Sequence, residues 1–181
     1  MIRYSVPEKA SVLFIGINPH PGSFRRGIPF SNNKNFWYNL SRAGMVHNTV
    51  AELKNDDNLR KVYSDDFPNI YRYGFMNIVD RPTVNTAALL KGEEHEGIQK
   101  IDDAIRTKKP LMVCFIGKVT YAKFSGRKEF SIGLQDFRIH DTLVYVSSFP
   151  IRGPNSTRIA EMAEIREILE RMQKPLNNKE K

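Results

Sequence analysis

The chain has 181 residues, 40% of them hydrophobic and 10% aromatic, which suffices for one domain with a sizeable core. Lysine and arginine number 28 against 20 acidic residues, and the formal charge of +8 favours a polyanionic partner such as nucleic acid. A single cysteine, Cys114, excludes an intramolecular disulfide, a CxxC zinc site and a cysteine-bound iron–sulfur cluster. No apolar run reaches the roughly 18 residues of a membrane span, so we expect no membrane partner.

The elements are predicted from the period of the apolar residues, because near-continuous runs indicate strands covered on both faces and spacings of three or four indicate helices. In chain order they are a strand at 12–17, a helix with Phe36, Trp37, Leu40 and Ala43 on one face, a strand at 73–79, a helix with Ile98, Ile101 and Ile105, a strand at 111–116, a short helix at 118–124, a strand at 142–147, and a helix from 156 onward with Ile159, Met162, Ile165, Leu169 and Met172 on one stripe. Cys114 falls within the third strand and is expected to be a small buried hydrophobe.

Strands that alternate with helices predict an α/β fold. We expect a three-layer α/β/α sandwich with a central four-stranded, mostly parallel sheet. No repeat or linker divides the chain, so residues 1–181 are predicted to form a single domain, with a flexible tail at 174–181. Ligands of such sheets bind outside the carboxyl ends of the strands, and the unusual residues of this chain follow the predicted strands.

The familiar catalytic patterns are missing. His20, His47, His95 and His140 lack the spacing of metal ligands, and no glycine-rich phosphate-binding motif follows the first strand. We therefore expect no metal and no other cofactor.

The segment that follows the first strand is the most unusual one, with the sequence G-I-N-P-H-P-G-S at 16–23. Its two prolines fix the backbone and its glycines permit close approach, so the loop would direct hydrogen-bonding groups at a small ligand. Asn18 could equally satisfy local backbone groups in a turn, and the pattern alone leaves both interpretations open.

The run from Gly16 to Phe30, followed by N-F-W at 35–37, resembles the first motif of the mismatch-specific uracil-DNA glycosylase and thymine-DNA glycosylase family, within the uracil-DNA glycosylase superfamily. Later matches follow in order: V-D-R-P-T at 79–83, I-G-K at 116–118, and a loop with Pro, Ser and Arg after the fourth strand. The resemblance implies the superfamily's α/β fold. It also implies a DNA repair enzyme that hydrolyses the N-glycosidic bond of uracil, or of thymine or another deaminated base mispaired with guanine.

The resemblance makes Asn18 the catalytic residue, which positions the water that attacks the sugar C1′. Phe30 would stack on the extracted base or serve as a core aromatic, and Ser23 would line the pocket near the base C5 edge or bond to its own loop. Asn77 would contact the base or remain a strand-end amide. The base-pocket residues implied in this way are Ile17, His20, Ser23, Phe30 and Asn77.

Two departures from the family pattern bear on the substrate. His20 and Pro21 stand where family members usually have Gly, so a side chain could narrow the pocket or bond to the base. The loop after the fourth strand, S-S-F-P-I-R-G-P-N-S-T-R, is longer than the compact form of the bacterial mismatch-specific enzymes, so the resemblance does not imply that the opposite base is read. The first motif also lacks the acid of the fast uracil-specific branch, so we expect a slow, monofunctional enzyme. Lyase chemistry would require a pocket lysine, and none is obvious, with Lys118 the one that is left open.

Enzymes of this class extrude the target nucleotide and fill the gap with a wedge. Ile151 and Pro154 would supply apolar bulk, while Arg152 and Arg158 would reach phosphate or the orphaned base. The implied DNA-binding residues are Lys118, Ile151, Arg152, Gly153, Pro154, Asn155, Ser156 and Arg158, with Arg25 and Arg26 beside them. Asp80 and Arg81 are assigned to the scaffold.

The implied partner is double-stranded DNA that contains uracil or a mispaired or deaminated base. We expect the protein to bind this DNA as a monomer. Its expected location is the cytoplasm, at the nucleoid, or the nucleus if the source is eukaryotic. Two alternatives remain open: a non-catalytic nucleic-acid-binding module on the same fold, and an enzyme that acts on free nucleosides or nucleotides.

Overall fold

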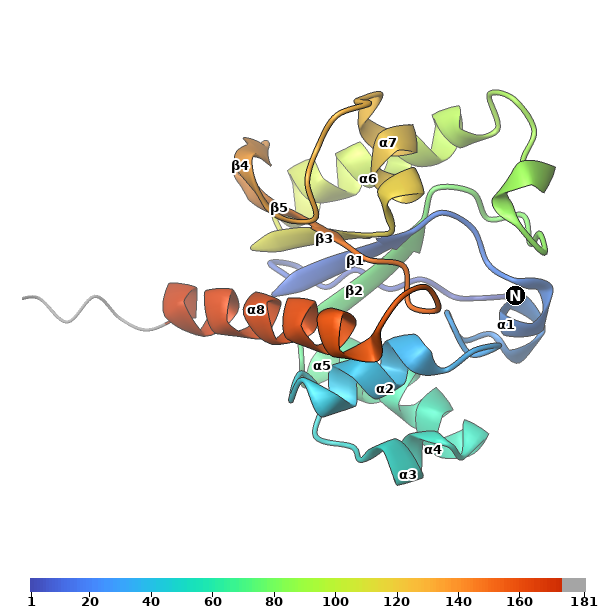
Figure 1. The fold of residues 1–181 in the computed structure, drawn as a ribbon, viewed down its shortest axis with the longest axis vertical. Coiled ribbons are helices and arrows are strands. Elements are labelled where there is room, and N and C mark those ends of the chain that lie inside the picture. The colour runs from blue at the N-terminus through green and yellow to red at the C-terminus, as the bar shows by residue number, and fades with distance from the viewer. Residues whose placement is uncertain (174–181) are drawn as a thin grey trace, which may run out of the picture.

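A computed structural model describes residues 1–173, and the tail predicted at 174–181 lies outside them. One sheet lies between two layers of helices (Figure 1). In chain order the elements are β1 (Val12–Gly16), α1 (Pro21–Arg26), α2 (Asn35–Arg42), α3 (Val50–Leu53), α4 (Asp56–Lys61), the π-helix η1 (Val62–Asp66), α5 (Phe67–Asn69), β2 (Tyr73–Asn77), the 3-10 helix η2 (Thr86–Ala88), α6 (Glu94–Lys108), β3 (Met112–Ile116), α7 (Lys118–Ser125), β4 (Gly133–Ile139), β5 (Thr142–Ser147) and α8 (Asn155–Gln173).

The sheet has the strand order β2-β1-β3-β5-β4. Its first four strands in this order run parallel, and β4 pairs antiparallel with β5 at the edge. The predicted α/β/α sandwich with a mostly parallel sheet is confirmed, but the predicted number of four strands is wrong, because the sheet has five. The missed strand β4 alternates between partly buried and exposed residues, so its sequence lacks the continuous apolar run of a central strand.

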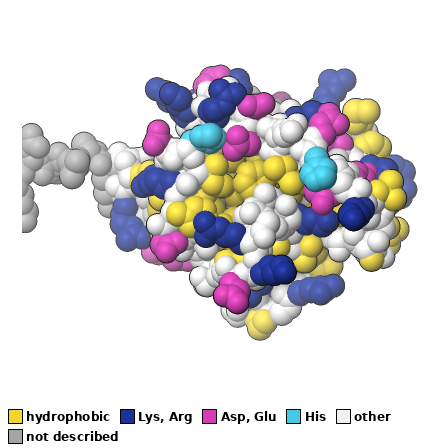
Figure 2. All heavy atoms as spheres, turned by 90° about the horizontal axis from the view of Figure 1, so that it is seen from above, with side chains coloured by type: hydrophobic (Ala, Val, Ile, Leu, Met, Phe, Trp, Pro, Cys, Tyr) yellow, Lys and Arg dark blue, Asp and Glu magenta, His cyan; other side chains and the backbone are white. Residues whose placement is uncertain are grey.

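Alternate residues of the central strands face opposite helical layers. From β1, Val12 and Phe14 join the core that includes α2 and α8, whereas Leu13 and Ile15 join the core beneath α6 and α7. Figure 1 shows these two pairs of helices on opposite sides of the sheet. On the α6 and α7 side, apolar side chains gather near the middle of the surface among charged ones (Figure 2), because several residues that cover this core are only partly buried.

Residues 21–26, interpreted from the sequence as part of a rigid loop, form the short helix α1. Pro21 opens the helix, and Nδ1 of His20 caps it by accepting a hydrogen bond from the Gly22 N–H at 3.1 Å. Gly27 ends it with a φ of 74°, a left-handed conformation that glycine adopts at little cost. The segment after β1 is therefore a short capped helix where the two prolines suggested a loop.

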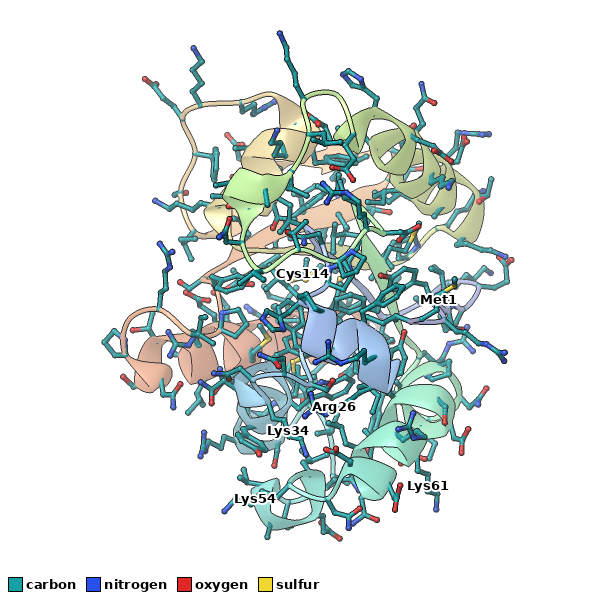
Figure 3. The ribbon with its side chains drawn as sticks, turned by 90° about the vertical axis from the view of Figure 1, so that its right-hand side faces the viewer. Met1, Arg26, Lys34, Lys54, Lys61 and Cys114 are labelled. Atoms are coloured by element: carbon teal, nitrogen blue, oxygen red, sulfur yellow. The ribbon has the colours of Figure 1, made fainter. Side chains whose placement is uncertain are left out.

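Residues 50–69 form α3, α4, η1 and α5, which are too short and polar to show a helical period in the sequence. Lys34 anchors them, because its Nζ lies 2.6 Å from Asp56 Oδ1 and donates to the Lys54 carbonyl at 2.6 Å. Arg26 Nε lies 3.4 Å from the same carboxylate, and Figure 3 shows Arg26 and Lys34 near each other. Lys34 and, more weakly, Arg26 lower the pKa of Asp56, so Arg26 adds less to the basic edge than the sequence implied.

Cys114 lies in the centre of β3 and is fully buried (Figure 3). Burial raises the pKa of its thiol to about 12, so the group stays protonated near neutral pH. The prediction of a small buried hydrophobe is confirmed. In residues 1–173 no helix combines the length and the apolar character that crossing a membrane requires.

Gly97 lets α6 touch the backbone that follows β2. A Cβ at this position would overlap the carbonyl oxygen of Ile78. Gly97→Ala is therefore expected to lower the free energy of unfolding by about 3 kcal/mol, measured by urea denaturation. Alanine otherwise stabilises a helix interior by about 1 kcal/mol relative to glycine, so the sign of the change is diagnostic.

Gly126→Ala is the matched control for Gly97→Ala. A Cβ on Gly126 meets nothing within 4 Å, but the residue has a φ of 70°, so only a backbone cost of about 1 kcal/mol is expected. A Gly97→Ala protein that is as stable as wild type, or more stable, would contradict the contact with Ile78.

Candidate active site

A cleft of about 660 Å³ lies where the carboxyl ends of β1, β2, β3 and β5 meet. Its walls come from the residues that follow these strands and from residues 23–33 and 83–86. The sequence-predicted residues that line it are Ile17, Asn18, His20, Ser23, Phe30, Asn77, Lys118, Ile151 and Arg152. The structure thus brings together all six residues predicted for catalysis and base binding, with three of the eight predicted for DNA binding.

The side-chain amide of Asn18 has an orientation that follows from its partners. Its Nδ2 donates to Thr83 Oγ1 at 2.7 Å and to the Pro19 carbonyl at 3.2 Å. The Thr83 hydroxyl donates its own hydrogen to the Asn85 carbonyl at 2.7 Å, so towards Asn18 it can only accept. Both partners therefore require the amide nitrogen, and Asn18 Oδ1, which bonds to no described residue, is left as an acceptor at the cleft.

Two polar side chains of the α1 region also line the cleft. Because His20 Nδ1 accepts the Gly22 N–H, the neutral ring carries its hydrogen on Nε2 and can donate from that atom. Ser23 is 2% exposed, and its Oγ accepts the N–H of Asn32 at 2.9 Å. The hydroxyl of Ser23 is thus bonded to the following loop, as one of the two interpretations expected, while the residue still lines the cleft.

Phe30 is partly buried between the cleft and the core. Its ring centroid lies 5.0 Å from that of Phe36, 5.8 Å from Phe75 and 6.1 Å from Phe149. Its φ of 54° falls in the left-handed region, which bulky residues rarely adopt. Such strain persists only where the surroundings impose it, and it is concentrated at ligand sites. Phe30 therefore packs on the core and faces the cleft at once.

Asn77 ends β2 and is 7% exposed. Its Nδ2 donates to the hydroxyl of Tyr4 at 2.7 Å, so it is bonded within the protein as a strand-end amide would be. It lines the cleft and also a second cavity of about 290 Å³. Asn77 therefore contributes to both pockets.

The predicted wedge loop divides into a cleft-facing part and a supporting part. Ile151, 54% exposed, and Arg152 line the cleft, whereas residues 153–156 are exposed outside it. Arg158 is only 4% exposed, and its guanidinium donates to Asn155 Oδ1 at 2.8 Å and to the Arg152 carbonyl. In this conformation Arg158 supports the loop from inside and has little surface to offer a phosphate.

Several cleft residues were given no role from the sequence, among them Thr83, Val84, Val119 and Phe75. Thr83 appeared only as the end of the V-D-R-P-T motif, and the signal that could have singled it out is a hydroxyl placed just beyond a strand end. Val84 and Val119 are 73% and 53% exposed, and together with Ile151 they form an apolar rim from two loops and the first turn of α7. Phe75 was taken only as a strand residue. An exposed valine in a polar loop carries no sequence signal.

An ion pair between Arg81 and Glu93 joins the two ends of the segment that carries Thr83. Arg81 Nε lies 2.6 Å from Glu93 Oε1, and its Nη2 donates to Glu93 Oε2 at 2.8 Å and to the Ala88 carbonyl at 2.9 Å. The Leu90 N–H donates to the same carboxylate at 2.9 Å. The pairing with Arg81, followed by the Leu90 bond, lowers the pKa of Glu93 to about 2. Arg81 therefore has the supporting contacts expected of a scaffold residue.

The residues of the cleft contain no set of metal ligands, and no group of three or more His, Cys, Asp or Glu that could hold a metal occurs within residues 1–173. A comparison with models of known protein families finds a match over residues 3–171, nearly the whole chain. The matching family is described as the uracil DNA glycosylase superfamily.

The carboxyl group of Glu93 is expected to titrate near pH 2 in the folded protein, instead of near its usual 4.5. Because the folded pKa is depressed, the pair stabilises the loop fully above pH 4.5, and this contribution is lost as the pH falls towards 2. An NMR titration of the Glu93 side-chain carbon measures this pKa. Arg81→Gln should move it back towards 4.5, and an ordinary value in the wild-type protein would contradict the ion pair.

Proposed function

The chain belongs to the uracil DNA glycosylase superfamily, and from this premise we propose that it is a DNA repair glycosylase that removes uracil from duplex DNA. Thymine and other deaminated bases mispaired with guanine are further candidate substrates, as in the mismatch-specific branch. The observation that carries the proposal is the amide of Asn18, whose nitrogen is held by Thr83 and Pro19 and whose oxygen is free to accept beside an aromatic wall.

The proposed reaction needs an oriented water and a tolerable leaving group. Asn18 Oδ1 accepts a hydrogen from the water and directs its oxygen at C1′ of the extruded nucleotide. The new C1′–O bond forms as the C1′–N1 bond breaks, and the electron pair of that bond leaves with the base as an anion. The proton of the water passes to solvent. A neutral amide is a weak base, so the rate comes from orientation and electrostatics.

The remaining cleft residues suit a flat, polar ring. Phe30 and Phe75 supply an aromatic surface on which the base can stack, and Ile17 closes the apolar part of the pocket. His20 donates from Nε2 to a base carbonyl or to the departing anion, which is the additional hydrogen bond that the unusual residue after Asn18-Pro19 could provide. Ser23 limits the room beside the base.

The rim of the cleft suits duplex DNA. Ile151, Val84 and Val119 expose apolar side chains that can enter the gap left by the extruded nucleotide. Lys118 and Arg152 stand beside them as exposed cations for phosphates, within a chain of formal charge +8. The proposal takes the chain to act on DNA as a monomer. An enzyme with this role would work where the genome lies.

The base-release proposal predicts that Asn18→Ala lowers the single-turnover rate on a duplex with one U·G pair by at least about 10²-fold, because the water loses its alignment. Alkaline cleavage of the abasic product measures the rate, and Asn58→Ala on α4, outside the cleft, is the control. Full activity of Asn18→Ala would remove the amide from the mechanism.

The outcome with wild-type protein separates the rival functions. Salt-dependent DNA binding without release of any base, tested with uracil, thymine, hypoxanthine and xanthine opposite each normal base, would instead indicate a non-catalytic binding module. Release from free nucleosides that duplex DNA does not inhibit would indicate a small-molecule enzyme.

Thr83→Val is expected to lower the same rate by about 10–100-fold without unfolding the protein, because the amide of Asn18 loses the acceptor that fixes it. The backbone bond from Thr83 N to the Pro19 carbonyl, 3.1 Å, is unaffected by the substitution. Thr83→Ser keeps the hydroxyl and should retain most of the activity. Equal rates for the valine and serine variants would show that this hydroxyl does not orient Asn18.

A further inference from the structure

Two buried charged residues near the start of α8 have no part in the proposed chemistry. Arg158 is 4% exposed and Glu161 is 7% exposed, and their spacing of three residues places them on the same side of the helix. Neither forms an ion pair with a residue in 1–173. A buried charge is costly unless hydrogen bonds compensate it, so the partners of these two groups show what each of them supports.

Glu161 clamps the residue that follows β5. Its Oε2 accepts the Ser148 N–H at 2.8 Å, and its Oε1 accepts the Ser148 hydroxyl hydrogen at 2.6 Å. Both carboxylate oxygens therefore hold one residue, by its backbone and by its side chain, and bonds to a charged acceptor are about twice as strong as neutral ones. Ser148 is the first residue after β5 that lines the cleft, so the clamp fixes the point where the chain reaches the site.

Arg158 holds the far part of the same loop, which is the orange segment between β5 and α8 in Figure 1. Its guanidinium donates to the Arg152 carbonyl and to Asn155 Oδ1. Between the two points of attachment, the Arg152 N–H donates to the Phe149 carbonyl at 3.3 Å and closes a turn. Ile151 lies within this turn and is 54% exposed. The exposed side chain therefore projects from a loop that α8 holds on both sides.

Phe149 links the clamp to the aromatic wall of the cleft. Its ring centroid lies 6.1 Å from that of Phe30, and its side chain packs over Gly117, where a Cβ would lie 3.3 Å from the Phe149 ring. Because Phe149 directly follows Ser148, a displaced Ser148 would move this ring and the turn that carries Ile151. The carboxylate of Glu161 thus acts on the cleft through its hold on Ser148.

We propose that Glu161 is a positioning residue for nucleotide extrusion: its clamp on Ser148 holds the turn at 149–152 where Ile151 can take the place of the extruded nucleotide. This inference rests on the proposed glycosylase function. An apolar side chain stabilises the extruded state when it fills the vacated space, and a loop that is already fixed needs no further ordering to do so. Glu161 does not line the cleft, so its effect falls on the equilibrium between the stacked and the extruded nucleotide.

Glu161→Ala tests this inference by removing the clamp. The probe is a duplex with one hydrolysis-resistant 2′-fluoroarabino uridine opposite guanine and with 2-aminopurine as the next base of the same strand. The fluorescence of 2-aminopurine rises when its neighbour leaves the stack, so at saturating protein it measures the extruded fraction. We expect the ratio of extruded to stacked nucleotide to fall about tenfold in the variant.

Glu161→Gln separates the clamp from the charge. The amide can accept the Ser148 N–H through its oxygen and donate to the Ser148 hydroxyl through its nitrogen, so both bonds can be kept. We therefore expect this variant to retain most of the extrusion seen with wild-type protein. A ratio as low as that of Glu161→Ala would overturn the clamp as the cause.

Glu164→Ala is the matched control on the same helix. The carboxylate of Glu164 accepts the Tyr145 hydroxyl hydrogen at 2.6 Å, so the variant removes a comparable bond between α8 and β5 without touching the loop. The extrusion ratio should be unchanged. A loss equal to that in Glu161→Ala would overturn the inference, because general loosening of α8 would then explain both.

Ser148→Ala removes the hydroxyl part of the clamp from the side of the loop and leaves α8 intact. It should lower the extrusion ratio about threefold, and it decides the question where Glu161→Ala does not fold. If wild-type protein releases uracil but the fluorescence with Glu161→Ala and with Ser148→Ala equals that with wild type, the role of Glu161 is wrong and the glycosylase function stands. If wild-type protein releases no base from any duplex, the proposed function fails and this inference fails with it.

Discussion

The bond between Asn18 Nδ2 and Thr83 Oγ1 is the constraint on which the site depends. An amide side chain is ambiguous as a hydrogen-bonding group, since either end could face a ligand. The ambiguity is removed here because the Thr83 hydrogen is already used by the Asn85 carbonyl and because Pro19 offers only a carbonyl. The fold thus places the hydroxyl of Thr83, which is 65 residues further along the chain, next to the amide of Asn18 just beyond the end of β1.

That placement follows from the parallel sheet. β1 and β2 are neighbours, so the segments that leave their carboxyl ends start side by side, and Thr83 N bonds to the Pro19 carbonyl across them. The pairing of Arg81 with Glu93 closes the second segment, while Gly97 allows α6 to press against its start at Ile78. These contacts therefore help to hold the segment from which Thr83 reaches the amide of Asn18.

The sequence predicted the layered α/β fold and the main strands because each central strand is a continuous apolar run, a signal that survives without tertiary information. It missed β4, whose alternation at a sheet edge is weak, and α1, where two prolines suggested a loop although one of them opens a helix. Local motifs identified Asn18, Phe30 and Asn77 as cleft residues. They could not identify the contact of Tyr4 with Asn77, because it joins segments far apart in the chain. They also could not predict that Arg158 points inward, because this depends on how one loop folds back.

Asn18 and Asn77 obey the same physical rule. Each is a neutral amide near the end of a parallel strand, and each donates from its nitrogen to a hydroxyl. The oxygen of each amide bonds to no described residue. Carboxylates would also accept, but in the proposed reaction a negative charge in the cleft would repel phosphates and oppose the anion on the departing base. In a chain of formal charge +8, fixed amides supply directed acceptors without that repulsion, at the cost of a weaker base.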